Sequence, residues 1–179
     1  MALTIALLRA VNVGGRKLMM AELRQLMAEL GFEGARTLLQ SGNLVLDAGG
    51  LAGAELEARL EAATRARFGL ATDYLVRTPA EWTSIVAANP FGDFARADPA
   101  HLLVMLLKAE PGPEAVAALR AAIVGREELA AVGRELFITY PDRIFQSKLT
   151  GALIERRLGL RGTARNWNTV GKLAELAST

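Results

Sequence analysis

His101–Leu107 (HLLVMLL) is the stretch that decides how this chain of 179 residues is organised. It is an apolar run of strand length, and it opens a series of elements that the N-terminal half already contains. Pro113 begins the helical pattern that follows, since proline suits the first turn of a helix. Two strands are then expected at Glu128–Val132 and Glu135–Tyr140, on either side of Gly133-Arg134.

The second series closes with a helix, a short strand and a last helix. Gly159 is expected to end the first of these helices in the left-handed conformation that glycine tolerates. Gly162–Arg165 is long enough only for a short edge strand. Asn166 is a natural N-cap for a final helix predicted from about Trp167 to Ala177.

The N-terminal half shows the same order of elements. The apolar pattern predicts a strand at Leu3–Arg9, a helix that Gly31 stops, strands at Arg36–Gln40 and Asn43–Asp47 joined by Ser41-Gly42, a helix ending near Gly69 and a strand at Asp73–Arg77. Between the two series lies Thr78-Pro-Ala-Glu81, a capping box that starts a connecting helix. Asn89-Pro90 ends that helix, and residues 90–100 are expected to be a loop without regular structure.

The order β-α-β-β-α-β, a connecting helix and the same order again predicts the fold class. It is typical of an α+β protein of two tandem ferredoxin-like (split βαβ, α/β-plait) units with antiparallel sheets. The expected boundaries are 1–78 for the first unit, 79–100 for the connecting helix and loop, and 101–179 for the second unit with its C-terminal helix. The repeat is one of element order and not of residue identity.

Composition argues against several classes of protein. With 51% apolar residues the chain can build a sizeable core, and no apolar run reaches the roughly 18–20 residues of a membrane span. The start, MALTIALLRAVNVGG, has no basic segment before its apolar run and is typical of a first strand, not of a signal peptide. No cysteine and a single histidine argue against disulfides and metal ligation, and favour a cytoplasmic protein.

Charge is segregated along the chain although the net charge is only +2. Residues 1–24 carry a net charge of +3, residues 25–142 carry −6 and residues 143–179 carry +5. The basic ends favour an anionic partner. A solvated arginine face on the helix near 149–158 would explain the C-terminal excess equally well.

Four separated segments resemble one known family. They are LLRAVNVGGRKLMMAEL (7–23), LLQSGNLV (38–45), SKLTGALIERRLG (147–159) and TARNWNTVGKL (163–173). These motifs are similar to those of the DUF1697 family of bacterial proteins, whose function is unknown. The resemblance implies a tandem α/β-plait fold and supplies no catalytic residue. Ala10-Val11, where Gly-Ile is usual, and Gly171, where a larger apolar residue is usual, depart from the pattern.

Topology predicts a candidate site in the first unit. The first two strands of a split βαβ unit run parallel, so their C-terminal ends meet at one edge of the sheet. That edge is expected to collect Arg9, Asn12, Lys17, Gln40, Ser41 and Asn43. Gly14 and Gly15 would let the backbone approach a phosphate or carboxylate. The same residues also suit ligand-free turns, and the GxxxxGK[ST] spacing of a Walker A loop is absent.

A second candidate site is predicted where the third and fourth strands of the second unit end. That edge is expected to collect His101, Ser147, Lys148, Arg165, Asn166 and Asn168. A helix N-terminus beside Arg165 and Lys148 would attract an anion. The structural alternatives are a simple cap at Asn166, a core position for Trp167 and a structural role for His101.

Three functions follow from these candidates. The first is binding of a small anionic ligand, a nucleotide or a phosphorylated metabolite. The second is a nucleic-acid-binding module that relies on phosphate contacts, because the strands are nearly free of the aromatic residues that stack on bases. The third is an enzyme of unknown class, for which His101, Ser147 and Lys148 would have to meet in one pocket. Nothing in the sequence indicates a cofactor or an oligomeric state.

Overall fold

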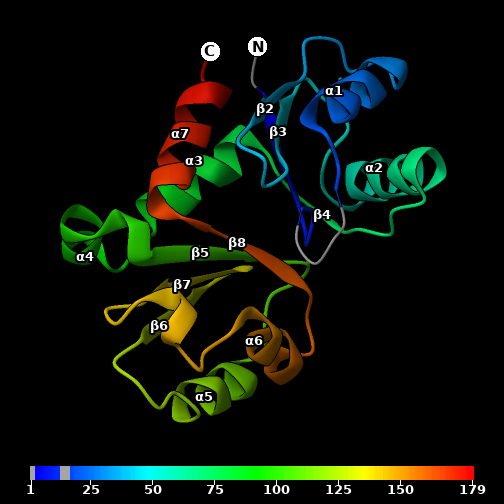
Figure 1. The fold of residues 1–179 in the computed structure, drawn as a ribbon. Coiled ribbons are helices and arrows are strands. Elements are labelled where there is room, and N and C mark those ends of the chain that lie inside the picture. Colours follow the sequence, from blue (N-terminus) through cyan, green and yellow to red (C-terminus); the bar gives the residue numbers. More distant parts are fainter. Residues whose placement is uncertain (1–2, 13–16) are drawn as a thin grey trace. The chain divides into compact units, whose positions relative to one another are not determined.

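The computed structural model describes residues 3–12 and 17–179. It has a mixed α+β structure with two four-stranded antiparallel sheets, each accompanied by helices (Figure 1). Met1–Ser84 and Lys172–Thr179 form one compact unit, and Ile85–Gly171 form the other. The predicted α+β class with antiparallel sheets is confirmed.

The sheet of the first unit has the strand order β2-β3-β1-β4. Its elements are β1 (Thr4–Leu8), α1 (Met20–Glu29), β2 (Arg36–Leu38), β3 (Asn43–Leu46), α2 (Gly53–Phe68) and β4 (Tyr74–Arg77). Alternate residues of each strand face α1 and α2, because successive side chains of a strand point to opposite faces. The resulting core contains Ala6, Leu8, Leu23, Met27, Leu44, Leu46, Leu56, Leu60, Tyr74 and Val76.

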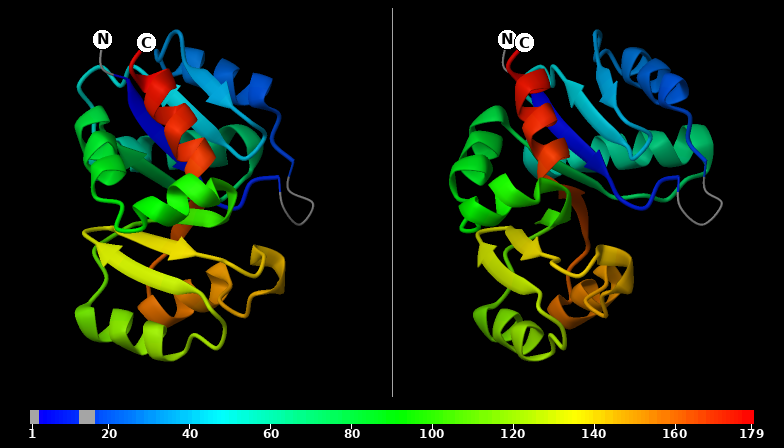
Figure 2. Two further views of the ribbon diagram at one scale, coloured as in Figure 1. Left: turned by 90° about the vertical axis from the view of Figure 1, so that its left-hand side faces the viewer. Right: turned by 60° about the vertical axis from the view of Figure 1, so that its left-hand side comes forward.

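The sheet of the second unit repeats this arrangement with the order β6-β7-β5-β8. Its elements are β5 (Leu102–Leu107), α5 (Pro113–Ala121), β6 (Glu128–Val132), β7 (Glu135–Thr139), α6 (Gly151–Leu158) and β8 (Gly162–Asn166). Helices α5 and α6 lie on one face of the sheet (Figure 2). Their core contains Met105, Leu107, Val116, Leu119, Leu129, Leu136, Ile138, Tyr140, Leu149 and Ile154.

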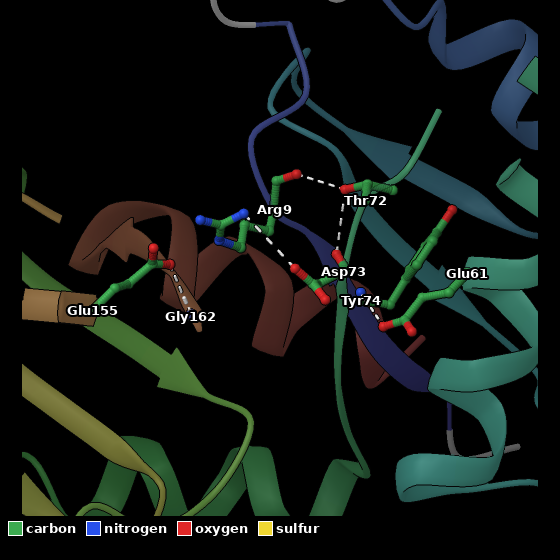
Figure 3. A network of polar contacts seen from close by, with 7 residues as sticks. All are labelled: Arg9, Glu61, Thr72, Asp73, Tyr74, Glu155 and Gly162. Carbon is green, nitrogen blue, oxygen red and sulfur yellow. Dashed lines mark hydrogen bonds and ion pairs between the residues drawn. The ribbon is translucent and has the colours of Figure 1, made fainter. Parts of the chain in front are cut away.

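Glutamate side chains from the helices cover the edge strands β4 and β8. Glu57 and Glu61, one turn apart on α2, accept hydrogen bonds from the backbone N–H groups of Val76 and Tyr74, each at 2.9 Å. In the second unit Glu155 of α6 accepts the N–H of Gly162 at 3.0 Å (Figure 3). An edge strand otherwise exposes unpaired N–H groups to other chains, and these carboxylates satisfy them.

The connecting region is more ordered than the sequence predicts. Helix α3 (Pro79–Ala87) starts with the predicted capping box, in which Thr78 N–H donates to Glu81 and Glu81 N–H donates to the Thr78 hydroxyl. The expectation of an irregular loop at 90–100 is wrong, because this segment forms α4 (Gly92–Ala97) and the 3₁₀ turn η1 (Pro99–His101). A helix of six residues is too short to show an apolar period, so sequence patterning misses it.

The last helix, α7 (Trp167–Ala177), has the predicted bounds and the predicted cap. The Asn166 side-chain oxygen accepts the N–H of Thr169 at 3.0 Å. The tryptophan at its first position is half-buried, so it is only in part the core residue that the sequence favours. The C-terminal residue of the chain is held by the first unit, where Arg36 of β2 donates to the Thr179 hydroxyl at 2.7 Å.

Candidate functional site

The loop after β1 and the turn between β2 and β3 meet at one edge of the first sheet. Asn12 joins them, since its amide nitrogen donates to the carbonyls of Leu18 and Gln40. Its side-chain oxygen accepts the N–H of Leu18 at 2.8 Å. The backbone of Leu8 also donates to the Gly42 carbonyl at 2.8 Å. The predicted convergence of Asn12 with the turn is therefore present, and a structural clamp produces it.

The backbone at this edge adopts conformations that side chains disfavour. Ala10, Asn12 and Leu39 have φ angles of 54°, 57° and 61°, in the left-handed region that non-glycine residues seldom occupy. These are three of the four such non-glycine residues in the described part of the chain. Strained residues persist only where their surroundings hold them, and they cluster at binding and catalytic sites.

Asn43 has a structural role inside the hairpin. Its side chain is fully buried. Its amide nitrogen donates to the Leu38 carbonyl at 2.7 Å and to the Ser41 hydroxyl at 2.9 Å. Gln40 and Ser41 are exposed at the tip of the same turn. Of the predicted polar residues of the turn, Asn43 thus shapes it, and the other two are accessible to a ligand.

The two described cations of this edge differ in their surroundings. Arg9 lies beside β4, with its guanidinium 3.7 Å from the Asp73 carboxylate and its side chain 31% exposed (Figure 3). Thr72 donates to the Arg9 carbonyl at 2.6 Å and fixes the backbone there. Lys17 is exposed and makes no ion pair with any described residue. Gly14 and Gly15, also predicted for this site, lie outside the described residues.

The residues predicted for the second edge separate into distinct surroundings. His101 lies in η1, with its Nδ1 atom 2.8 Å from both carboxylate oxygens of Asp98. Its carbonyl accepts the N–H of Tyr140 at 2.9 Å, which places it beside the end of β7. Asn166 caps α7, and Asn168 is exposed on the first turn of that helix.

Arg165 lies within β8 and is buried. Its neighbour Ala164 packs against the core beneath α5 and α6, so Arg165 points to the opposite face of the sheet. Its guanidinium donates to the Thr163 hydroxyl at 2.7 Å and to the Ala164 carbonyl at 2.9 Å. Burial lowers the pKa of Arg165 to about 10, because desolvation disfavours the charged form.

Sequence reasoning missed the equivalent arginine of the first unit. Arg77 of β4 is fully buried and lies opposite Ile5 of β1, as Arg165 lies opposite Val104 of β5. Its neighbour Val76 packs under α1 and α2, so Arg77 also points to the other face. Comparing the last strands of the two predicted series would have found this pair, because DYLVR and GTAR both end in arginine.

Ser147 and Lys148 line a cavity of about 260 Å³ in the second unit. Ser147 donates to the Glu127 carboxylate and accepts the N–H of Leu149 at 3.0 Å. The described residues that line this cavity do not include His101. Glu127 and Asp98 were not predicted as site residues. Asp98 could have been found from its three-residue spacing to His101, whereas no local sequence pattern marks Glu127.

Other kinds of site find no support in the described part of the chain. No group of three His, Asp or Glu side chains that could hold a metal ion occurs among residues 3–12 and 17–179. Over the same residues, no helix is long and apolar enough to cross a membrane. The aromatic side chains on the described strands, Tyr74 and Phe137, are fully buried. They are not available to stack on bases.

Fold and surfaces together define a mixed α+β protein with a polar, strained loop edge on its first sheet and a charged cavity in its second unit. The chain belongs to the DUF1697 family, whose model is described as a protein of unknown function and matches residues 1–137. Among solved structures, the chain is similar to the conserved bacterial protein SP0830 from Streptococcus pneumoniae, with a TM-score of 0.75 and 20% identity over 98% of both chains. At that identity the likeness shows the fold alone. No curated protein matches the chain.

Proposed function

We propose that the protein binds a small anionic ligand, a nucleotide or a phosphorylated metabolite, at the loop edge of its first unit. The observation that carries this proposal is the Asn12 clamp. It ties Leu18 to Gln40, so the preceding residue, Lys17, is held near the exposed tip of the β2–β3 turn. The Lys17 ammonium is exposed and has no ion pair among the described residues, and the Ser41 hydroxyl and the Gln40 amide are exposed at the turn tip, a combination that suits a phosphate or a carboxylate.

The strained backbone supports a binding role over a simple turn. Left-handed conformations at Ala10, after β1, and at Leu39, in the β2–β3 turn, cost free energy and persist only where the surroundings hold them. Described backbone that is held in one conformation before the ligand arrives, here at Ala10, Asn12 and Leu39, loses less conformational entropy on binding. Arg9 supplies a second positive charge at the loop start, although Asp73 offsets part of it.

The proposal is tested by thermal-shift and calorimetric titration with inorganic phosphate, nucleoside mono- and triphosphates and sugar phosphates. Lys17→Ala is expected to weaken binding by about tenfold, which corresponds to roughly 1.4 kcal/mol. Binding is also expected to weaken as ionic strength rises. Lys172→Ala is the matched control, because it removes one exposed lysine of the same unit from helix α7. No stabilisation of the unmodified protein at millimolar ligand, or equal losses in both variants, would refute the proposal.

We also infer that each unit is a ferredoxin-like plait and that residues 79–100 connect them. The element order β-α-β-β-α-β and a sheet with the first and third strands at its centre support this inference. A cytoplasmic location in a bacterium stays a prediction from composition and from the family resemblance. A nucleic acid as the anionic partner and catalysis by an unknown reaction are alternatives, and no described contact favours either.

A further inference from the structure

The cavity of the second unit has a wall that combines both signs of charge. It lies between the segment after α5 and the segment that follows β7, and it has a volume of about 260 Å³. Its lining residues include Val124, Gly125, Glu127, Ser147, Lys148 and Leu149. The volume is below the roughly 300–1,000 Å³ of pockets for drug-sized ligands, so only a small molecule fits.

The Glu127 carboxylate has one oxygen that is satisfied and one that is not. Oε1 accepts the hydroxyl of Ser147. Oε2 is buried and has no hydrogen-bond partner among the described residues. A buried charged acceptor without a donor is costly, and native proteins seldom keep one without a reason. Glu127 therefore calls for a hydrogen-bond donor that the described chain does not supply.

Gly125 determines where this unpaired oxygen can lie. A Cβ atom at position 125 would collide with Glu127 Oε2, so the glycine lets the carboxylate rest against the backbone. The terminal torsion of a glutamate side chain is broad. A modest rotation of the carboxylate turns Oε2 from Gly125 towards the cavity, where a bound donor would meet it.

The positive charge on this wall also lacks a partner among residues 3–12 and 17–179. Lys148 is exposed and has no ion pair with a described residue. Asp142, the second carboxylate of the lining, is bonded to Arg126 through both of its oxygens. The cavity thus offers one carboxylate oxygen and one ammonium, with the apolar side chains of Val124 and Leu149 beside them.

We propose that this cavity binds a small zwitterion that carries a primary ammonium and a carboxylate, of the aliphatic amino-acid class. The ligand ammonium donates to Glu127 Oε2, and its carboxylate accepts from Lys148. The apolar part of the ligand packs against Val124 and Leu149. The inference goes beyond the anion site proposed above, because it concerns a different unit, different residues and a different ligand.

Three probes share one branched apolar body and differ in their charged groups. Leucine carries both the ammonium and the carboxylate, isopentylamine carries only the ammonium, and 4-methylpentanoate carries only the carboxylate. Alanine and valine extend the panel to smaller zwitterions. The expected result, by calorimetry and ligand-observed NMR at millimolar concentration, is binding of one or more amino acids and a loss of about tenfold when either charged group is missing. Equal binding of leucine and isopentylamine, or no binding of any amino acid, would overturn the proposal.

Substitutions in the protein test the same site while the ligand is kept constant. Glu127→Gln and Lys148→Ala are each expected to weaken amino-acid binding by about tenfold. Gly125→Ala is expected to strengthen amino-acid binding instead, because its new methyl pushes Oε2 away from position 125 and towards the cavity. Gly112→Ala is the matched control, since no atom lies within 4 Å of its Cβ position. Unchanged affinity in Glu127→Gln or Gly125→Ala, with the control folded, would contradict the assignment. Lys17→Ala is expected to leave amino-acid binding intact, which separates this site from the anion site.

Discussion

Single asparagines show how side chains organise the backbone of this protein. Asn12 joins a loop to a turn, Asn43 closes a hairpin from inside, and Asn166 caps a helix. In each case the side chain bonds to backbone groups nearby in the structure, which is the common behaviour of asparagine in turns and caps. For Asn12, a role in local structure and a place in the proposed ligand site are therefore compatible.

Gly42 lies at a close approach of the turn to Leu8 of β1 and Val11 of the loop. Its φ angle is 74°, and a Cβ there would lie 2.7 Å from Val11 Cγ2 and 2.8 Å from Leu8 Cβ. Gly42→Ala is expected to lower the free energy of unfolding by about 2–4 kcal/mol, through the left-handed backbone and the overpacking together. Urea unfolding measures this loss.

Gly34→Ala separates the two causes. Gly34 has a similar φ angle, 72°, but no atom lies within 4 Å of its Cβ position. Its replacement should therefore cost only the backbone term, about 1 kcal/mol. If the two variants lose equal stability, the close approach of Gly42 to the loop contributes nothing and the description of this edge is wrong.

At the scale of an element, α2 stabilises β4 through its carboxylates as well as through its apolar face. Glu57 is 7% exposed and accepts the N–H of Val76. Glu57→Ala is expected to cost about 1–3 kcal/mol, because it leaves a buried N–H without an acceptor. Glu57→Gln keeps a carbonyl oxygen at that position and should lose less.

The rate of amide hydrogen exchange at Val76 tests the hydrogen bond between this amide and Glu57 directly. The exchange rate of that amide should rise in Glu57→Ala well beyond the rise expected from global destabilisation alone. Glu22→Ala on α1 serves as the comparison, since its side chain is exposed and has no hydrogen bond among the described residues. A Val76 amide that stays as protected as before would show that the carboxylate does not hold the edge strand.

At the scale of the whole molecule, the two tyrosines report on the two units. The chain contains only Tyr74 and Tyr140, one in each unit. Tyr74 is hydrogen-bonded to Thr64 at 2.7 Å, and Tyr140 donates to the Leu149 carbonyl at 2.8 Å. Burial raises the pKa of each to about 12 from the ordinary value of 10.0.

The direction of these pKa shifts predicts alkaline unfolding. Because the folded state keeps both phenols protonated, their contribution to stability is complete below pH 10.0 and is lost as pH rises to about 12. Each tyrosine accounts for up to roughly 2–3 kcal/mol over this interval. As the pH is raised, the absorbance of tyrosinate should therefore appear only near the pH at which the protein unfolds.

The variant Tyr140→Phe leaves Tyr74 as the single reporter of the first unit, and Tyr74→Phe leaves Tyr140 as the single reporter of the second unit. An absorbance rise centred at pH 10.0 in either variant, with the fold intact, would contradict the burial of the remaining phenol.

The sequence by itself determined the elements, their order and the sheet class. Apolar runs of strand length, the Thr78–Glu81 capping box, the Asn166 cap and the stops at Gly69 and Gly159 all act through neighbours along the chain, so patterning can recover them. The prediction from the sequence failed at residues 90–100, because a six-residue helix carries no periodic signal.

Only the tertiary structure decided which polar residues meet. Asn12 reaches Gln40 as topology predicts, whereas Ser147 is bonded to Glu127, which sequence reasoning did not select. Arg165 is buried on a sheet face instead of lying at the open edge. The physical reason is that topology places strand ends to within several residues, whereas a hydrogen bond requires a distance near 3 Å and a particular side-chain rotamer. Packing around each side chain sets both, and packing depends on residues far away in the sequence.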